Sequence, residues 1–136
     1  APLETAINTS VVVVEQNDTS VHYPGGTISL QISSAQLPEA SDNNMCMLDE
    51  AALQFPLILR PAAIGDYFYP LGMQKKKKLS KFFIDLKLSK TAKEKVWVLV
   101  SNNRIAWVIG YRIDNRFKIT PASTEAVKFT FSPTAL

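Results

Sequence analysis

The sequence predicts a mainly β fold of the α+β class, with one or two short helices. Short runs of β-branched and alternating apolar residues recur along the chain, separated by Gly, Pro and Asn turn signals. Only one strong signal of an amphipathic helix is present. The chain has 136 residues, 46% of them hydrophobic and 20% charged, which is typical of a globular domain with its own core. We therefore expect a single domain over residues 1–136.

Three segments of the first half have the character of strands. The first is a β-branched run, and the second alternates Ile28, Leu30 and Ile32 on one face. The third is a short apolar run that ends at a proline, which cannot join a ladder of hydrogen bonds. In chain order we expect a strand at 10–16, a turn at 22–26, a strand at 27–33, a polar loop at 35–44 and a strand at 55–62.

The second half contains the helical signal and a hairpin. Apolar residues at i, i+3, i+4 and i+7 form one stripe, which we expect to pack on the core: Leu79, Phe82, Phe83 and Leu86. A capping-box pattern at Thr91–Glu94 predicts one further short helical turn, and Asn102-Asn103 between two apolar runs predicts a hairpin. The remaining expectations are a shaped loop at 63–73, hairpin strands at 96–101 and 104–110, and closing strands at 116–120 and 127–132.

Charge is divided unevenly along the chain. Residues 1–59 contain seven acidic residues and no Lys or Arg, whereas residues 60–136 contain all 15 basic residues and five acidic ones. Such asymmetry indicates a basic face for nucleic acid, an anionic membrane or an acidic partner. The alternative is that the acidic and basic halves attract each other across the fold. That attraction would lower the positive electrostatic potential available to a partner.

Catalytic chemistry has few candidate residues. His22 is the only histidine and Cys46 the only cysteine, and the sequence has neither a Walker A loop nor G-x-G-x-x-G. We therefore expect no catalytic, metal or cofactor site in this chain. The single cysteine fits a reducing compartment, and no apolar run reaches the roughly 20 residues of a membrane span. One alternative stays open, in which Asp66, Asp85 and Asp114 converge as a Mg²⁺ or hydrolase site.

Binding chemistry is better supplied in the basic half. Arg112 and Arg116 follow a strand and are candidates to clamp phosphates in a bidentate manner. Tyr67, Phe68 and Tyr69 either stack on bases or pack their loop onto the core. Lysines also flank the helical stripe, where they either contact phosphates or form a merely solvated face: Lys76, Lys77, Lys78 and Lys81.

An ordered series of motifs runs from Leu53 to Thr120. In chain order they are Leu59-Arg60, GDYFYPLGM at 65–73, KKLS at 77–80, FFID at 82–85, Lys87, WVL at 97–99 and IAWVIGYRIDNRF at 105–117. The series resembles the C-terminal domain of the tRNA(Ile)-lysidine synthetase family, and its order makes the resemblance specific. Lys75 stands where that family usually has Gly, Lys81 where it usually has Asp, and Tyr67 where it often has Arg or Trp.

The resemblance implies a non-catalytic tRNA-binding domain of an ATP-dependent ligase that attaches lysine to the wobble cytidine of tRNA(Ile). ATP, with Mg²⁺, would act in a separate catalytic domain that carries an S-G-G-x-D-S loop, which this sequence lacks. The implied fold is a β-sandwich-like, three-layer domain similar to one in the phenylalanyl-tRNA synthetase β-subunit. The chain is then expected to be a C-terminal fragment of a cytoplasmic enzyme. Its expected partners are the acceptor-stem side of tRNA(Ile) and the catalytic domain of the same protein, and a homodimer is left open.

Seven basic residues are expected to contact tRNA under this interpretation: Arg60, Lys76, Lys77, Lys78, Lys81, Arg112 and Arg116. Two interpretations of other classes remain. One is a docking module whose basic face meets an acidic partner protein, and the other is the small hydrolase that would use the three aspartates.

Overall fold

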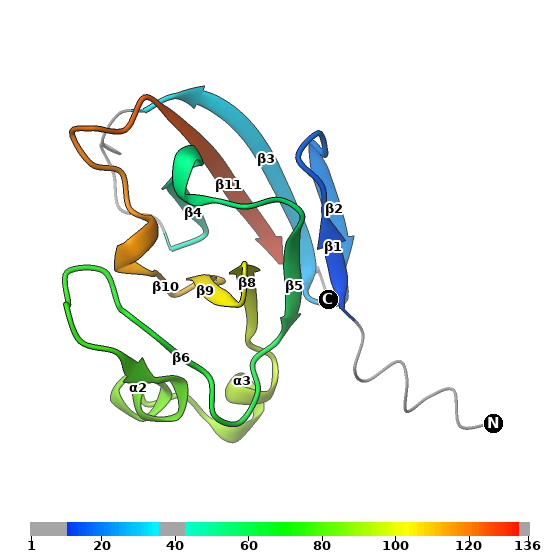
Figure 1. Ribbon diagram of the computed structural model, residues 1–136. Coiled ribbons are helices and arrows are strands. Elements are labelled where there is room, and N and C mark those ends of the chain that lie inside the picture. Colours follow the sequence, from blue (N-terminus) through cyan, green and yellow to red (C-terminus); the bar gives the residue numbers. More distant parts are fainter. Residues whose placement is uncertain (1–10, 36–42, 134–136) are drawn as a thin grey trace.

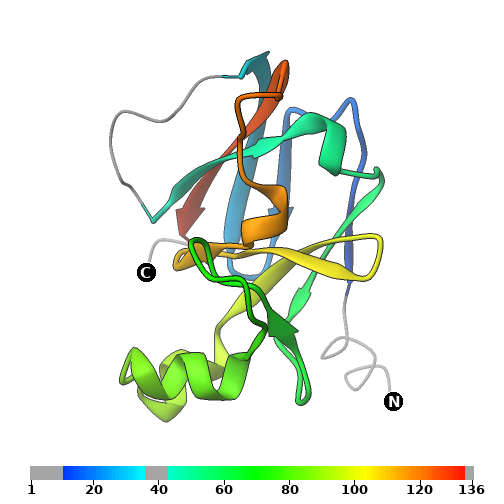
Figure 2. The same cartoon turned by 60° about the vertical axis from the view of Figure 1, so that its left-hand side comes forward.

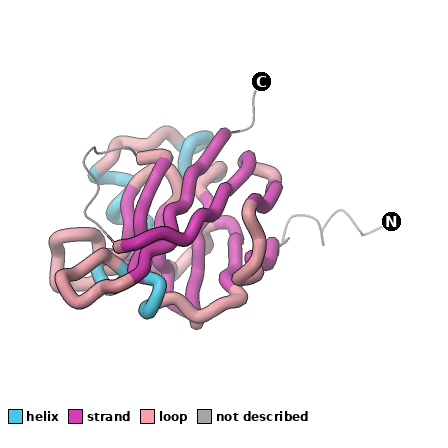
Figure 3. The backbone as a smooth tube through the Cα atoms, turned by 90° about the horizontal axis from the view of Figure 1, so that it is seen from above, coloured by secondary structure: helices cyan, strands magenta, loops and turns pink. Residues whose placement is uncertain are grey.

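The computed structural model describes residues 11–35 and 43–133, which form two antiparallel sheets and a third layer (Figure 1). Seen from above, most of the described chain is strand or loop, and helix is confined to short segments (Figure 3). The mainly β fold with short helices, which the sequence predicts, is confirmed.

The first sheet has five strands in the order β1-β5-β8-β9-β10. Its centre is the hairpin of β8 and β9, whose connecting residues Asn102 and Asn103 have φ angles of 50° and 66°. Positive φ at both positions is typical of the type I′ turn that matches the twist of paired strands. The strands are β1 (Val12–Val14), β5 (Leu57–Pro61), β8 (Trp97–Ser101), β9 (Arg104–Val108) and β10 (Arg112–Ile113).

The second sheet has four strands in the order β2-β3-β11-β4. Its two longest strands pair along their whole length, from Gly26 opposite Pro133 to Ser34 opposite Glu125. Gly26 permits this approach, since its φ is +148° and a Cβ there would lie 2.2 Å from the carbonyl oxygen of Ser132. The strands are β2 (Ser20–Tyr23), β3 (Gly26–Ser34), β4 (Met45–Asp49) and β11 (Glu125–Pro133).

The third layer covers the face of the first sheet that points away from the second sheet. Figure 2 shows its two helices on the side of the molecule opposite β3 and β11. It consists of the ribbon β6 (Tyr67–Phe68) and β7 (Lys77–Lys78), followed by α2 (Leu79–Asp85) and α3 (Lys90–Glu94). Two short 3₁₀ helices, η1 (Glu50–Ala52) and η2 (Asn115–Phe117), complete the described elements.

Two apolar clusters hold the three layers together. The first cluster fills the space between the two sheets and includes Leu59, Trp107 and Phe129. The second lies between the first sheet and the third layer: Phe68, Leu79, Phe82, Phe83, Val96, Val98, Val100, Ile105 and Val108. The first sheet is thus covered on both faces, which explains why β8 and β9 are apolar almost throughout. The likeness to the phenylalanyl-tRNA synthetase domain stays a prediction.

The strongest local patterns are confirmed. Residues 57–61 form a strand that ends at Pro61, residues 97–108 form the hairpin, and the expected aromatic pair of α2 is buried. Local sequence was sufficient here because turn chemistry and apolar periodicity agree with the final packing.

Other expectations are wrong. The expected strand at 116–120 is instead the 3₁₀ helix η2, because the carboxylate of Asp114 accepts from the backbone N–H of Arg116 and turns the chain. Leu86 is the C-cap of α2 and is 38% exposed, and Ile32 near the end of β3 is 49% exposed. Helix α3 exists, but Ser89 rather than Thr91 caps it. Strands β2, β4, β6 and β7 were not anticipated, and the expected loop at 35–44 lies mostly outside the described residues.

No helix among the described residues is long and apolar enough to cross a membrane.

Candidate nucleic-acid interface

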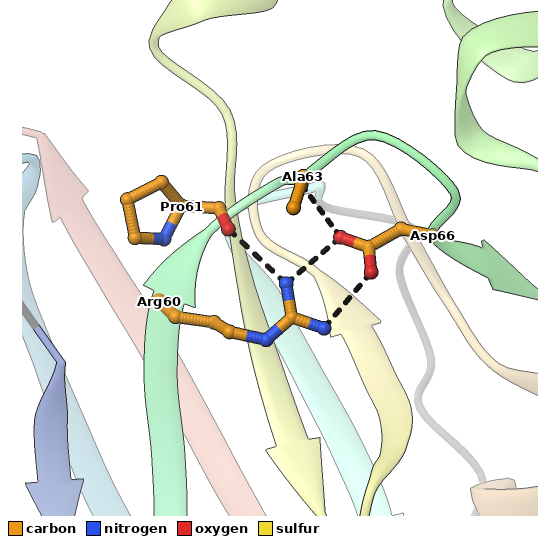
Figure 4. A network of polar contacts seen from close by, with 4 residues as sticks. All are labelled: Arg60, Pro61, Ala63 and Asp66. Carbon is orange, nitrogen blue, oxygen red and sulfur yellow. Dashed lines mark hydrogen bonds and ion pairs between the residues drawn. The ribbon is translucent and has the colours of Figure 1, made fainter. Parts of the chain in front are cut away.

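An arginine–aspartate pair fixes the loop that leads from β5 into the third layer. Arg60 donates from Nη1 to Oδ2 of Asp66 at 2.8 Å and from Nη2 to Oδ1 at 3.0 Å (Figure 4). The same Oδ2 accepts from the backbone N–H of Ala63 at 2.7 Å, and Arg60 also donates to the carbonyl of Pro61 at 3.2 Å. The Asp66 side chain is 13% exposed. This bidentate, partly buried pair closes the turn around Gly65.

A second pair anchors the other end of the same loop. The fully buried carboxylate of Asp114 accepts from the backbone N–H of Tyr69 at 2.9 Å and from Nε and Nη2 of Arg116, both at 3.0 Å. The guanidinium of Arg116 also lies 4.3 Å from the centre of the Tyr69 ring. Asp114 therefore joins the end of β10 to η2 and to the residue after β6. Its buried charge is compensated by the Tyr69 N–H, the Arg116 N–H and the Arg116 guanidinium.

Two lysines of the basic run have partners in the third layer. Lys77 forms an ion pair with Asp85 of α2, and this pairing holds the pKa of the Asp85 carboxyl below its ordinary value, with Lys81 nearby acting in the same direction. Lys76 lies over the ring of Tyr67 at 4.8 Å from its centre. Both cations remain on the surface layer, where Lys76 is exposed and Lys77 is half-buried.

Lys78, the N-cap residue of α2, and Lys81 within α2 are both exposed. Neither forms an ion pair with another of the described residues. The opposite face of the helix is buried, and Arg112 lies over the Phe82 ring at 5.6 Å. The helix therefore presents its charge outward while its apolar side fixes it to the sheet.

The third layer concentrates positive charge on one side of the fold. Residues 62–96 contain nine lysines against Asp66, Asp85 and Glu94, and two of those acids are paired with cations. The described strands of the second sheet carry two acidic residues, Asp49 and Glu125, against one basic residue, Lys128. Most cations of the second half of the chain therefore lie in the first sheet and the third layer, although β1 joins the first sheet and β11 the second. Figure 2 shows the third layer on the side of the molecule opposite β3 and β11.

The three aspartates do not share a site. Asp66 serves the turn after β5, Asp114 is buried beneath Arg116, and Asp85 pairs with a lysine at the surface. Within the described ranges, no group of three or more His, Cys, Asp or Glu side chains is placed to hold a metal ion. Local turn and helix contacts explain each acid, which leaves the hydrolase interpretation without a geometric basis.

One basic residue was missed by the sequence analysis. Arg104, the first residue of β9, lines a cavity of about 90 Å³ together with Arg60 and Arg116. The Asn102-Asn103 turn places Arg104 at the start of β9. No local pattern links it to Arg60 and Arg116, because the three arginines are far apart in sequence. Their meeting depends on the packing of the β5–β6 loop against β9.

A larger cavity of about 330 Å³ lies beside α3 and is mainly apolar. Its walls include the rings of Tyr23, Trp97 and Tyr111, and Lys95 is its one charged side chain. Tyr23 and Trp97 meet edge to face with their ring centres 4.9 Å apart, and burial raises the pKa of the Tyr23 hydroxyl well above its ordinary value. The lining of this cavity is mainly apolar, so it lacks the positive charge expected of a phosphate-binding site.

Comparison with known proteins agrees with these observations. The family model described as the TilS substrate C-terminal domain matches residues 57–129, which overlaps the motif-rich stretch from 53 to 120. The tRNA(Ile)-lysidine synthase of Parabacteroides distasonis is 39% identical over 100 residues, covering 74% of this chain and 23% of that protein. That of Bacteroides thetaiotaomicron is 48% identical over 63 residues, covering 46% of this chain and 15% of that protein.

A solved structure, the crystal structure of TILS C-terminal domain, has the same fold. It superposes with a TM-score of 0.77 at 18% identity and covers 93% of this chain and 100% of that chain. The chain spans less than a quarter of the length of the two relatives named above. Since the family model covers more than half of the residues, the chain belongs to the TilS substrate C-terminal domain family.

Proposed function

We propose that this chain is the tRNA-binding C-terminal domain of a tRNA(Ile)-lysidine synthase. The observation that carries the proposal is the outward-facing, mostly unpaired lysine surface of the third layer. We call this set of residues, Lys75, Lys76, Lys78 and Lys81, the lysine face. Lysine ammonium groups on a firmly packed helix neutralise backbone phosphates, and contacts of this kind position an RNA without reading its bases.

The parent enzyme, on this proposal, is a cytoplasmic ATP-dependent ligase that joins lysine to the wobble cytidine of tRNA(Ile). ATP and Mg²⁺ act in its catalytic domain, and the present domain holds the acceptor-stem side of the same tRNA. The family relationship and the names of the relatives support this assignment. Incubated with ATP, lysine and tRNA(Ile), the 136-residue chain alone should form no lysidine. Turnover above a blank would contradict the assignment of catalysis to a separate domain.

The seven residues expected to contact tRNA divide into two groups. Arg60 and Arg116 are held by carboxylates, Arg112 lies over an aromatic ring, and Lys77 pairs with Asp85. Lys78 and Lys81 project freely, and Lys76 is only loosely held over Tyr67. We assign most of the salt-dependent affinity to the lysine face, because its charges are the least compensated.

The experiment is a tRNA titration at several salt concentrations, with a double variant and a matched control. If about four phosphates are neutralised, log K should fall with log[salt] at a slope of roughly −3. Lys78→Glu with Lys81→Glu should weaken binding about tenfold or more, since each change removes an attraction and adds a repulsion. Lys128→Glu should have little effect, because β11 carries Lys128 in the opposite sheet.

A flat salt response, or unchanged affinity in the double variant, overturns the proposal. Binding of an acidic catalytic domain in place of tRNA would then favour the docking module. Sedimentation of the free chain tests the homodimer that the sequence left open.

A further inference from the structure

The cavity between the β5–β6 loop, β9 and η2 has the make-up of an anion site. Three arginines line it, Arg60, Arg104 and Arg116, and its one acidic lining residue, Asp66, is paired with Arg60. Its volume is about 90 Å³. This space is small and open to solvent, which suits a small anionic group such as a phosphate.

Two of the arginines are oriented before any ligand arrives. Arg60 uses three of its five N–H donors on Asp66 and the Pro61 carbonyl, which leaves its Nε–H and one Nη2–H. Arg116 uses Nε–H and one Nη2–H on Asp114, which leaves three donors. Because the carboxylates fix both planes, little side-chain entropy remains to be lost when an anion binds.

Arg104 supplies the uncompensated charge. It is exposed, and no hydrogen bond or ion pair joins its side chain to the other described residues. Its backbone is nevertheless fixed, since Ser101 and Arg104 pair across the Asn102-Asn103 turn. The side chain is therefore free to close onto a ligand from a firmly placed strand.

The balance of charge identifies the kind of phosphate. Asp66 and Asp114 each cancel one guanidinium, so the three arginines leave one net positive charge at the cavity. A backbone phosphodiester carries a single negative charge and matches it. A terminal phosphate carries about −1.5 to −2 at neutral pH and would be left partly uncompensated.

We infer that the Arg60, Arg104 and Arg116 cavity binds one backbone phosphodiester of the RNA, with Arg104 as the residue that closes on it. This inference rests on the proposed tRNA binding and adds to it a single, shaped phosphate position separate from the lysine face. The fork geometry of arginine fits two phosphate oxygens at once, which a lysine cannot do.

The test compares the parent chain with Arg104→Gln, Arg104→Lys and the control Lys128→Gln. Arg104→Gln should weaken tRNA binding severalfold and reduce the magnitude of the salt slope by about one. Arg104→Lys should restore the slope but not the full affinity, and Lys128→Gln should change neither. Thermal melting of each variant checks that the fold is retained.

A second measurement follows the free anion. Dimethyl phosphate, a diester with a single negative charge, should at millimolar concentration shift the amide resonances of Gly65, Asn103 and Arg104 in the parent but not in Arg104→Gln. ATP should not displace tRNA from the cavity; displacement by ATP overturns the phosphodiester assignment.

The outcomes separate the two proposals. If tRNA binds the parent and Arg104→Gln changes neither affinity nor slope, the cavity assignment fails while the lysine face stands. If tRNA does not bind the parent at all, the proposed function fails and the RNA assignment of the cavity fails with it. Shifts with dimethyl phosphate but without tRNA binding would then identify a site for free anions only.

Discussion

The arginines and the lysines of this domain differ in what their charges do. Arg60 and Arg116 each pair with a nearby carboxylate, Asp66 and Asp114, which neutralises most of their positive charge. Lys78 and Lys81 stand on a helix that is fixed by apolar contacts, and their ammonium groups face solvent. The basic residues therefore divide into arginines that shape a loop and keep only part of their donors for a ligand, and exposed lysines that form no ion pair. Substitutions in either group test this distinction.

The largest effect should come from the apolar attachment of the lysine face. Phe82 is 3% exposed and packs edge to face on Phe68 with the ring centres 5.0 Å apart. Phe82→Ala should cost about 3–5 kcal/mol of unfolding free energy, through lost burial and the cavity left behind. Ile84→Ala in the same helix is the control, because Ile84 is 68% exposed and should cost far less. Denaturant unfolding measures both, and equal losses would mean that the helix is not held by its apolar side.

The next largest loss of stability should distinguish a buried carboxylate, Asp114, from an exposed one, Asp85. Asp114→Ala removes the acceptor for Arg116 and for the backbone N–H of Tyr69, and it should cost about 3 kcal/mol. The same change at Asp85, whose carboxylate is exposed, should alter the free energy of unfolding much less. If the two variants lose similar stability, the distinction between structural and surface pairs fails.

A smaller effect is expected for the free lysines themselves. Lys78→Glu with Lys81→Glu should change stability by no more than about 0.5 kcal/mol at each position, because both side chains are exposed and neither forms an ion pair among the described residues. A large loss of stability in this double variant would show that the lysines hold the fold, and its weaker tRNA binding would then have a trivial cause. Melting curves should accompany every affinity measurement.

The smallest effect concerns the pair of Lys77 and Asp85. Pairing lowers the pKa of Asp85 in the folded state, so its stabilisation is present above the unfolded pKa and is lost as the pH falls through the folded value. The melting temperature of the parent should exceed that of Lys77→Gln slightly at pH 6, and the difference should begin to shrink only below about pH 4 and disappear below the folded pKa of Asp85. Lys75→Gln, which has no ion pair among the described residues, should follow the parent at every pH. A difference between parent and Lys77→Gln that persists in acid contradicts this account.

Local patterns predicted the parts of the fold that local chemistry decides. The hairpin depends on the Asn102-Asn103 turn, and α2 depends on a stripe that reaches from Leu79 to Phe83. By contrast, β4 has the sequence MCMLD, which carries no β-branched residue, and it becomes a strand because β11 pairs with it. Such pairing is non-local and leaves no periodic signal.

The candidate site was predicted in composition but not in geometry. Composition and charge identify the basic residues, but no local pattern predicts that Arg60 pairs with Asp66 or that Arg116 pairs with Asp114. Both carboxylates had been considered as candidate metal ligands. Arg104 was overlooked because its two neighbours in the cavity lie 44 residues before it and 12 residues after it. Only the folded chain brings those positions together.

The position of β11 within its sheet has a consequence for how the domain is made. This strand, the last that the structure describes, lies between β3 and β4; it pairs with β3 along its whole length and with β4 over residues 126–130. While the ribosome is still translating the middle of the chain, β3 and β4 have an empty place between them, and Ile28 and Leu48 lack the cover of Phe129. Cooperative folding must therefore wait until Glu125 and the residues after it have emerged. A ribosome that stalls before this point leaves an open sheet edge, which is a substrate for chaperones or for aggregation.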